Sequence, residues 1–93
     1  MIIEKSDRFK NELEIIVDFI ALDSVNRALE FYDVIISKIN KISDNPYIHR
    51  KRVSLNDENI RELIYRGYTV PFEMDTQNNK IIILGTFNQN LWQ

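Results

Sequence analysis

The chain has no cysteine, and it has only two glycines and two prolines among its 93 residues. The lack of cysteine excludes disulfides and cysteine-based metal sites, and it fits a cytoplasmic protein. No apolar run approaches the roughly 20 residues that a membrane-spanning helix needs. The chain opens on Met-Ile-Ile-Glu-Lys-Ser, without a basic region followed by an apolar stretch, so we expect neither a signal peptide nor a membrane partner.

The chain also lacks an excess of basic residues. Its net charge of −2 and its pI of about 5.3 argue against a broad basic face that binds nucleic acid. The charge is uneven, because residues 1–48 carry six Lys/Arg against nine Asp/Glu, whereas residues 49–66 carry five against three. Two interpretations of the basic run at 50–52 stay open: a solvated loop or edge strand, which is the commoner case, or a binding patch.

Two segments have the periodicity of amphipathic helices. The first begins after Ser6, a suitable N-cap, and is expected to end near 21–22. Its apolar face consists of Phe9, Leu13, Ile16, Val17 and Ile20. Asp23 or Ser24 can cap the second, which we expect to stop at Asn45-Pro46 because proline disfavours helix in the residue before it. Its apolar face consists of Ala28, Phe31 or Tyr32, Ile35, Ile36, Ile39 and Ile42.

The remaining segments have the alternation and composition of strands. The expected strands are 1–4, 52–55, 60–65, 68–74 and the apolar run 80–87. Arg66-Gly67 should form a tight turn, and the polar residues 75–79 a loop. Pro71 cannot donate to a strand ladder, so we expect it at a position that is not hydrogen-bonded or at a bulge.

These elements predict a single α+β domain over residues 1–93, in the order β-α-α-β-β-β. The two helices are joined by very few residues and should form an antiparallel hairpin. With no third long helix present, the apolar face of this hairpin must pack on one face of an antiparallel sheet. The other face of the sheet stays at least partly open, which suggests a partner.

This order of elements, over essentially the whole chain, resembles the small bacterial RelE/ParE toxins of type II toxin–antitoxin modules. The residues that carry the resemblance are Ser24-Val-Asn-Arg-Ala28, Arg61-Glu-Leu63, Gly67-Tyr68, Val70-Pro-Phe72 and Ile81-Ile-Ile-Leu84 leading to Phe87. The resemblance implies a cognate antitoxin as partner, and either a homodimer or a toxin–antitoxin heterotetramer. It implies no cofactor and no metal, and the sequence itself shows no phosphate loop or zinc pattern.

The family has two branches, and the resemblance implies different chemistry for each. The RelE branch cleaves mRNA on the ribosome without a metal, using Lys, Arg, His and Tyr side chains. The ParE branch inhibits DNA gyrase and is not a nuclease. Here Thr69 stands where the nucleases often have arginine, and residues 86–93 contain no Arg, Lys, His or Tyr. Both departures, together with the acidic pI, favour the gyrase inhibitor over an enzyme.

Several residues are candidates for function. If the chain is a nuclease, the site has to be built on Arg61, Arg66 and Tyr68, but arginine stays protonated and tyrosine titrates near 10, so they form a poor acid–base set. The candidate partner-binding residues are Arg61, Tyr65, Tyr68, Phe87, Leu91 and Trp92. Arg61 can face the open side of the sheet, or pair with Glu62, Glu73 or Asp75. A non-toxic relative that acts only as a binding module remains a third alternative.

Overall fold

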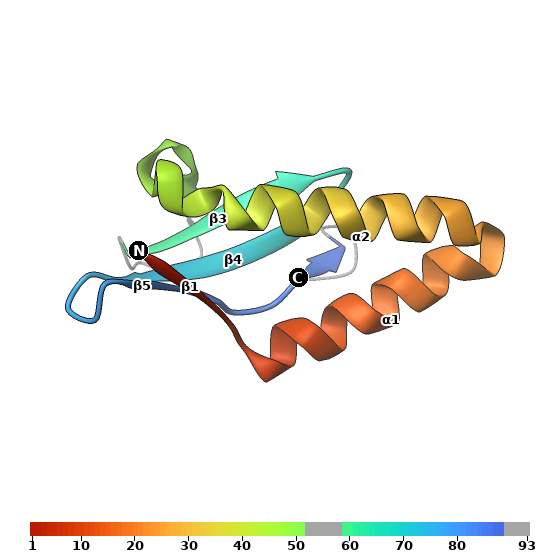
Figure 1. Cartoon of the computed structure of the whole chain (residues 1–93), viewed down its shortest axis with the longest axis horizontal. Coiled ribbons are helices and arrows are strands. Elements are labelled where there is room, and N and C mark those ends of the chain that lie inside the picture. The colour runs from red at the N-terminus through yellow and green to blue at the C-terminus, as the bar shows by residue number, and fades with distance from the viewer. Residues whose placement is uncertain (52–58, 89–93) are drawn as a thin grey trace.

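The computed structural model describes residues 1–51 and 59–88. The helices of these parts are α1 (Asp7–Asp23) and α2 (Val25–Asn40), followed by the 3-10 turns η1 (Ile42–Asp44) and η2 (Pro46–Ile48). The strands are β1 (Ile2–Lys5), β2 (Arg50–Lys51), β3 (Ile60–Tyr65), β4 (Tyr68–Asp75), β5 (Lys80–Ile83) and β6 (Phe87–Asn88). The predicted α+β class and the helical hairpin are both confirmed (Figure 1).

Both helices begin at serine caps: Ser6, as predicted, and Ser24, one of the two candidates for the second cap. The Ser6 side chain accepts a hydrogen bond from the amide of Phe9, and the Ser24 side chain accepts one from the amide of Arg27. Ser24 also ends α1, because its amide donates to the carbonyl of Ile20. One residue therefore separates the helices, and they turn back on each other as a tight hairpin.

The second helix ends earlier than predicted. It stops at Asn40 rather than at Asn45-Pro46, and the chain continues in the short turns η1 and η2. Ile42 remains fully buried in η1, so the apolar periodicity that extended the prediction is real. The 3-10 turns continue that buried face without continuing the α-helix. The predicted strand 52–55 lies outside the described residues, and β2 ends at the residue before it.

The hydrophobic core lies between the hairpin and one face of the sheet. Figure 1 shows α2 lying along β3 and β4, while α1 diverges from the sheet toward its end. The fully enclosed core side chains are Phe9, Leu13, Phe31, Ile35, Ile39, Ile42, Leu63, Val70, Phe72, Met74, Ile81 and Ile83. They alternate along the strands, so the intervening residues point to the opposite face.

The sheet is mixed rather than purely antiparallel, which corrects the prediction. Its strand order is β1-β5-β4-β3-β2, with β6 also paired to β4. All neighbouring strands are antiparallel except β1 and β5, which are parallel with Ile3 opposite Ile81. Parallel strands need a long connection, and the chain between β1 and β5, which includes the helical hairpin, provides one. β1 can therefore lie at the edge of the sheet beside β5.

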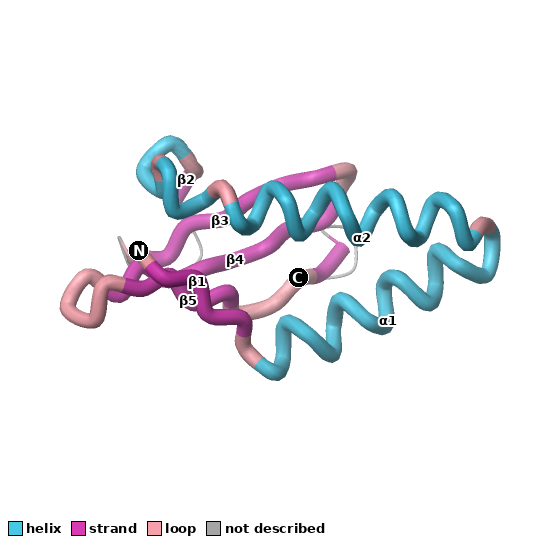
Figure 2. The backbone as a smooth tube through the Cα atoms, viewed as in Figure 1, coloured by secondary structure: helices cyan, strands magenta, loops and turns pink. Residues whose placement is uncertain are grey.

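The predicted final strand, 80–87, is divided in two. β5 pairs with residues 72–75 of β4, and β6 pairs with Tyr68 and Thr69 along the same side. Pro71 lies opposite the break, because the preceding pair in the register is Phe72 with Ile83. Figure 2 shows the loop that follows β5. In an extended strand, the nitrogen and the carbonyl of one residue point to the same edge of the strand. The carbonyl of Pro71 accepts from the amide of Leu84, so the nitrogen of Pro71 also points toward the segment after β5, which forms no regular strand. The expectation that Pro71 avoids a ladder bond is therefore confirmed.

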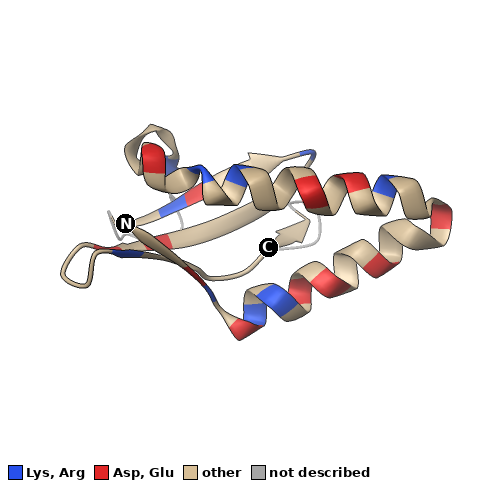
Figure 3. Cartoon of the chain, in the orientation of Figure 1, with Lys and Arg blue, Asp and Glu red and all other residues tan. Residues whose placement is uncertain are grey.

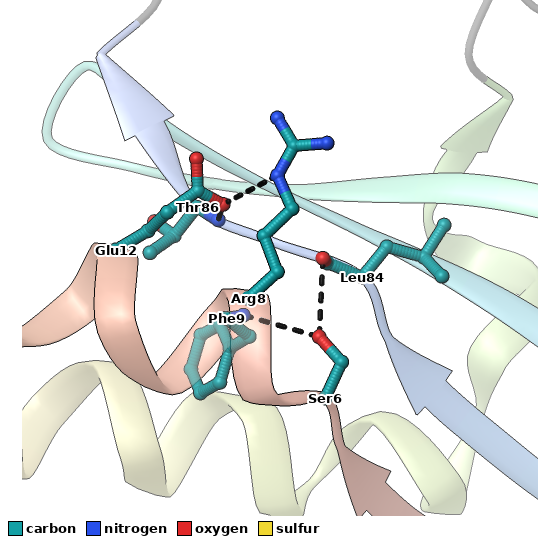
Figure 4. Close-up of polar contacts among 6 residues, drawn as sticks. All are labelled: Ser6, Arg8, Phe9, Glu12, Leu84 and Thr86. Atoms are coloured by element: carbon teal, nitrogen blue, oxygen red, sulfur yellow. Dashed lines mark hydrogen bonds and ion pairs between the residues drawn. The ribbon is translucent and has the colours of Figure 1, made fainter.

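Polar contacts with α1 hold the segment between β5 and β6 in place (Figure 4). The Ser6 hydroxyl, besides capping α1, donates to the carbonyl of Leu84 at 3.1 Å. Glu12 Oε1 accepts from the amide of Thr86 at 3.3 Å and pairs with Arg8 Nε at 3.2 Å. Gly85 leaves room for this carboxylate, because a Cβ there would lie 2.5 Å from the same oxygen. These contacts fix where β6 begins.

Replacing Ser6 by alanine should cost more stability than removing the other helix cap. Ser6→Ala loses the cap of α1 and the bond to Leu84, and we expect a fall in the free energy of unfolding of about 2 kcal/mol. Ser24→Ala loses one cap bond, at an exposed site, and should cost about 1 kcal/mol. Urea unfolding of both variants measures the difference, and equal losses would show that the Leu84 bond contributes nothing.

Candidate partner-binding surfaces

Arg61 lies on the helix-facing side of the sheet, so the expectation that it faces the open side is wrong. It has the same parity along β3 as the core residue Leu63. Its Nη1 donates to the carbonyl of His49 at 2.8 Å and to that of Tyr47 at 3.4 Å. Its guanidinium carbon lies 5.3 Å from the centre of the Tyr47 ring. Arg61 therefore fastens η2 to β3, and the expected pairing with neighbouring carboxylates is also not observed in the described residues.

His49 belongs to the same cluster. Its ring meets the edge of Phe72 with the ring centres 5.4 Å apart. The pKa of His49 is lowered from its usual value of 6.5, first because burial penalises the charged imidazolium and then because the Arg61 guanidinium repels it. The native protein therefore prefers neutral His49.

The stability of the protein should consequently fall as the pH drops below about 6.5. The unfolded chain binds a proton at His49 more readily than the native chain does, so protonation favours unfolding. His49→Gln should flatten the pH dependence between about pH 7.5 and pH 5.5. Urea midpoints measured across this window provide the test, and an unchanged slope in the variant would contradict the role of His49.

The two tyrosines at the β3–β4 turn pack against the hairpin. The ring of Tyr65 stacks on Phe31 with centres 5.7 Å apart, and the ring of Tyr68 meets Phe31 edge-on at 5.1 Å. Both are half-buried. Arg66 occupies the turn itself, with its guanidinium carbon 5.5 Å from the centre of the Tyr65 ring.

The residues considered for a nuclease site do not converge. Arg61 lies near the start of β3 and Arg66 just after its end, so their Cα atoms are roughly 16 Å apart along an extended strand. Arg61 is engaged by backbone carbonyls at its own end. Only Arg66 and Tyr68 share the turn. In the described residues no group of three or more His, Cys, Asp or Glu side chains is placed to hold a metal ion.

Of the other proposed binding residues, one is buried and two are not described by the structure. Phe87 is buried, with 8% of its surface exposed, and it pairs with Thr69 on the face of the sheet away from the helices. Leu91 and Trp92 lie outside the described residues.

The helices in residues 1–51 and 59–88 do not have the length and apolar character that a membrane span requires.

The exposed apolar side chains gather on the helical hairpin rather than on the open face of the sheet. Two stripes follow helical i, i+4, i+7 spacing. They consist of Ile15, Phe19 and Leu22 on α1, and of Val25, Leu29 and Tyr32 on α2, with exposed fractions between 45% and 86%. A groove of about 340 Å³ runs between the helices beside Tyr32 and Ile36. Of the six stripe residues, Tyr32 lines this groove, whereas Phe19 and Leu22 line a separate hollow near the tip. We call the six exposed residues of the two stripes the hairpin surface.

The part of the hairpin nearer its tip is strongly acidic as well as apolar, whereas the groove has lysines, Lys5 and Lys10, among its lining residues. Between Glu14 and Asp33 the chain has five carboxylates, all exposed, and a single arginine. That arginine, Arg27, is itself paired with Asp23 at 3.1 Å. Figure 3 shows acidic residues spread along both helices toward the tip of the hairpin. The surface is therefore suited to a partner that is both apolar and basic.

Sequence reasoning did not identify the hairpin surface. The sequence does contain the pattern for it. Each stripe has the spacing of an apolar helix face, and it lies at a different angle around the helix from the face that packs on the core. The choice between Phe31 and Tyr32 as the core residue of α2 reflected this overlap. The structure buries Phe31 and leaves Tyr32 on the surface stripe.

Comparison with known proteins gives a consistent family and fold. A family model described as the ParE toxin of type II toxin–antitoxin systems, parDE, matches residues 3–90. A solved structure of a chromosomal ParDE toxin–antitoxin system from P. aeruginosa is similar, with a TM-score of 0.75 and 19% sequence identity over 95% of each chain. No curated protein matches the chain. At that identity the structural likeness concerns the fold.

Proposed function

Because the chain belongs to the ParE family of type II toxin–antitoxin toxins, we propose that it inhibits DNA gyrase and is neutralised by a cognate antitoxin. The family match, over residues 3–90, carries the proposal. Toxin, antitoxin and gyrase would then meet in the cytoplasm. The toxin would act by binding a protein target, with no cofactor and no chemical step of its own.

The arrangement of the candidate catalytic residues supports binding over RNA cleavage. Metal-free cleavage needs a base for the ribose hydroxyl, a group that stabilises the phosphate, and an acid for the leaving oxygen. Arg61 and Arg66 lie at opposite ends of β3 and cannot share one phosphate. The single histidine, His49, is half-buried behind Arg61, and burial lowers its pKa. No convergent acid–base pair is formed by these groups.

We assign the antitoxin to the hairpin surface. An exposed apolar patch on so small a domain is typical of a protein interface. Its five carboxylates favour an antitoxin segment that presents apolar residues together with Lys or Arg. The same charge opposes a homodimer formed through this surface, because like charges would face each other across it.

Expression of the chain alone in a bacterium with a DNA-damage reporter tests the target. We expect growth arrest with filamentation and reporter induction, and inhibition of supercoiling when the purified chain is added to gyrase. Arrest with a silent reporter and cleaved mRNA would replace the proposal with ribosome-dependent RNA cleavage. Harmless expression, with gyrase unaffected, would leave a non-toxic binding module.

A further inference from the structure

The β3–β4 turn places an arginine where the backbone disfavours it. Arg66 has φ 49° and Gly67 has φ 80°, so both central residues of this two-residue hairpin are left-handed. Such turns favour Asn-Gly, Asp-Gly or Gly-Gly, because glycine, asparagine and aspartate adopt this conformation at lower cost than other residues. Elsewhere in the described chain, the one other non-glycine residue with positive φ is an asparagine, Asn79, at φ 53°. Residues held in disfavoured conformations are frequent at functional sites.

Arg66 is one of two cations gathered on a single aromatic ring. The Nζ of Lys38, from α2, lies 5.5 Å from the centre of the Tyr65 ring, the same distance as the guanidinium carbon of Arg66. Both distances are within the range of a cation–π interaction. Stacking on Phe31 fixes the ring itself. We call Lys38, Tyr65 and Arg66 the basic cluster.

The basic cluster has no ion-pair partner among residues 1–51 and 59–88. The recorded ion pairs of the described chain join Arg8, Arg27, Arg50 and Lys80 to carboxylates. Neither Lys38 nor Arg66 has a carboxylate partner among these residues, although both side chains are exposed. Two positive charges therefore lie beside one ring without a carboxylate partner in the described residues, on a chain whose net charge is −2.

We propose that the basic cluster binds an acidic segment of a partner protein. Arg66 can hold one carboxylate through two parallel N–H donors, and Lys38 can hold a second as a point charge. A nucleic acid is a less suitable ligand, because it needs a row of phosphate contacts and would be repelled by the acidic hairpin. The proposal goes beyond the proposed function and holds whether or not the target is gyrase.

An NMR titration of the intact ¹⁵N-labelled chain with a synthetic peptide of Glu and Ser tests the cluster. We expect the amide signals of Lys38, Tyr65 and Arg66 to move most, and the affinity to fall as salt is added. A duplex DNA serves as the competing probe. Movement centred elsewhere, no movement, or tighter binding of DNA at the same residues would each overturn the proposal.

Arg66→Asn separates binding from folding. Asparagine suits the left-handed turn better than arginine, so this variant should melt at the same or a higher temperature than the parent. Its affinity for the peptide should nevertheless fall about tenfold, because a charged hydrogen-bonding pair is lost. Lys10→Gln, at an exposed lysine of α1, is the matched control and should bind like the parent. Parental affinity in Arg66→Asn would overturn the proposal.

Discussion

Replacing Phe72 by alanine should lower the free energy of unfolding by about 3–5 kcal/mol. Phe72 lies in the middle of β4 with 0% of its surface exposed, between the hairpin and the sheet. The variant loses the burial of the ring and leaves a cavity that the surrounding side chains fill only partly. Because small domains are stable by only about 5–15 kcal/mol, a large share of the total would be lost.

The loss also removes the ring against which His49 packs. Phe72→Ala should therefore loosen the attachment of η2 in addition to opening the core. We expect a fall in the thermal midpoint of more than about 12 °C, measured by circular dichroism. Ile64→Ala is the matched control, because Ile64 belongs to β3 and is 40% exposed on the other face. Its cost should stay near 1 kcal/mol. Similar losses in the two variants would contradict the placement of the core.

The helical core could be predicted from the sequence because it depends on local spacing. Phe9 and Leu13 on α1, and Ile35 and Ile39 on α2, follow the 3.6-residue period and are buried as expected. The serine caps act within three residues and were equally visible. Local rules of this kind need no knowledge of the rest of the fold.

The features that depend on distant contacts were not predictable. The parallel pairing of β1 with β5 joins residues about 78 positions apart, and nothing in either strand specifies it. The break after Ile83 comes where Pro71 has no N–H to donate back to Leu84. Contacts from distant residues then hold the segment: the Ser6 hydroxyl donates to the carbonyl of Leu84, and the amide of Thr86 donates to Glu12. Arg61 was misplaced for the same reason, since its partners are carbonyls that η2 brings to it.

The sequence alone does not decide which of two apolar faces of one helix is buried. Val25, Leu29 and Tyr32 are as apolar and as regularly spaced as the residues of the core. Only the direction of the sheet decides which stripe is buried, and that direction is a property of the whole fold. The composition of a helix therefore indicates that two surfaces exist, while the tertiary structure determines which of them is left for a partner.

Removing the apolar side chains of the hairpin surface should release the toxin from its antitoxin. The double variant Leu29→Ala/Tyr32→Ala should weaken binding by about 2–4 kcal/mol, or roughly 30- to 1,000-fold. Both residues are exposed on α2, and alanine is the strongest helix former, so the fold should remain intact. The measurements are co-purification with a cognate antitoxin and the rescue of growth when both proteins are expressed.

The control variant removes as much apolar surface elsewhere. Ile48 and Ile64 are exposed in η2 and β3, away from the hairpin, and the double variant Ile48→Ala/Ile64→Ala should bind the antitoxin like the parent.

A charge variant tests the electrostatic part of the interaction. Asp18→Lys/Asp33→Lys should weaken the complex most at low salt, because the lost attraction is electrostatic. If the apolar variant still binds fully while the charge variant does not, the hairpin attracts the antitoxin without forming the buried interface. If neither variant loses binding, the antitoxin binds another surface, and the acidic hairpin must be explained by a different partner.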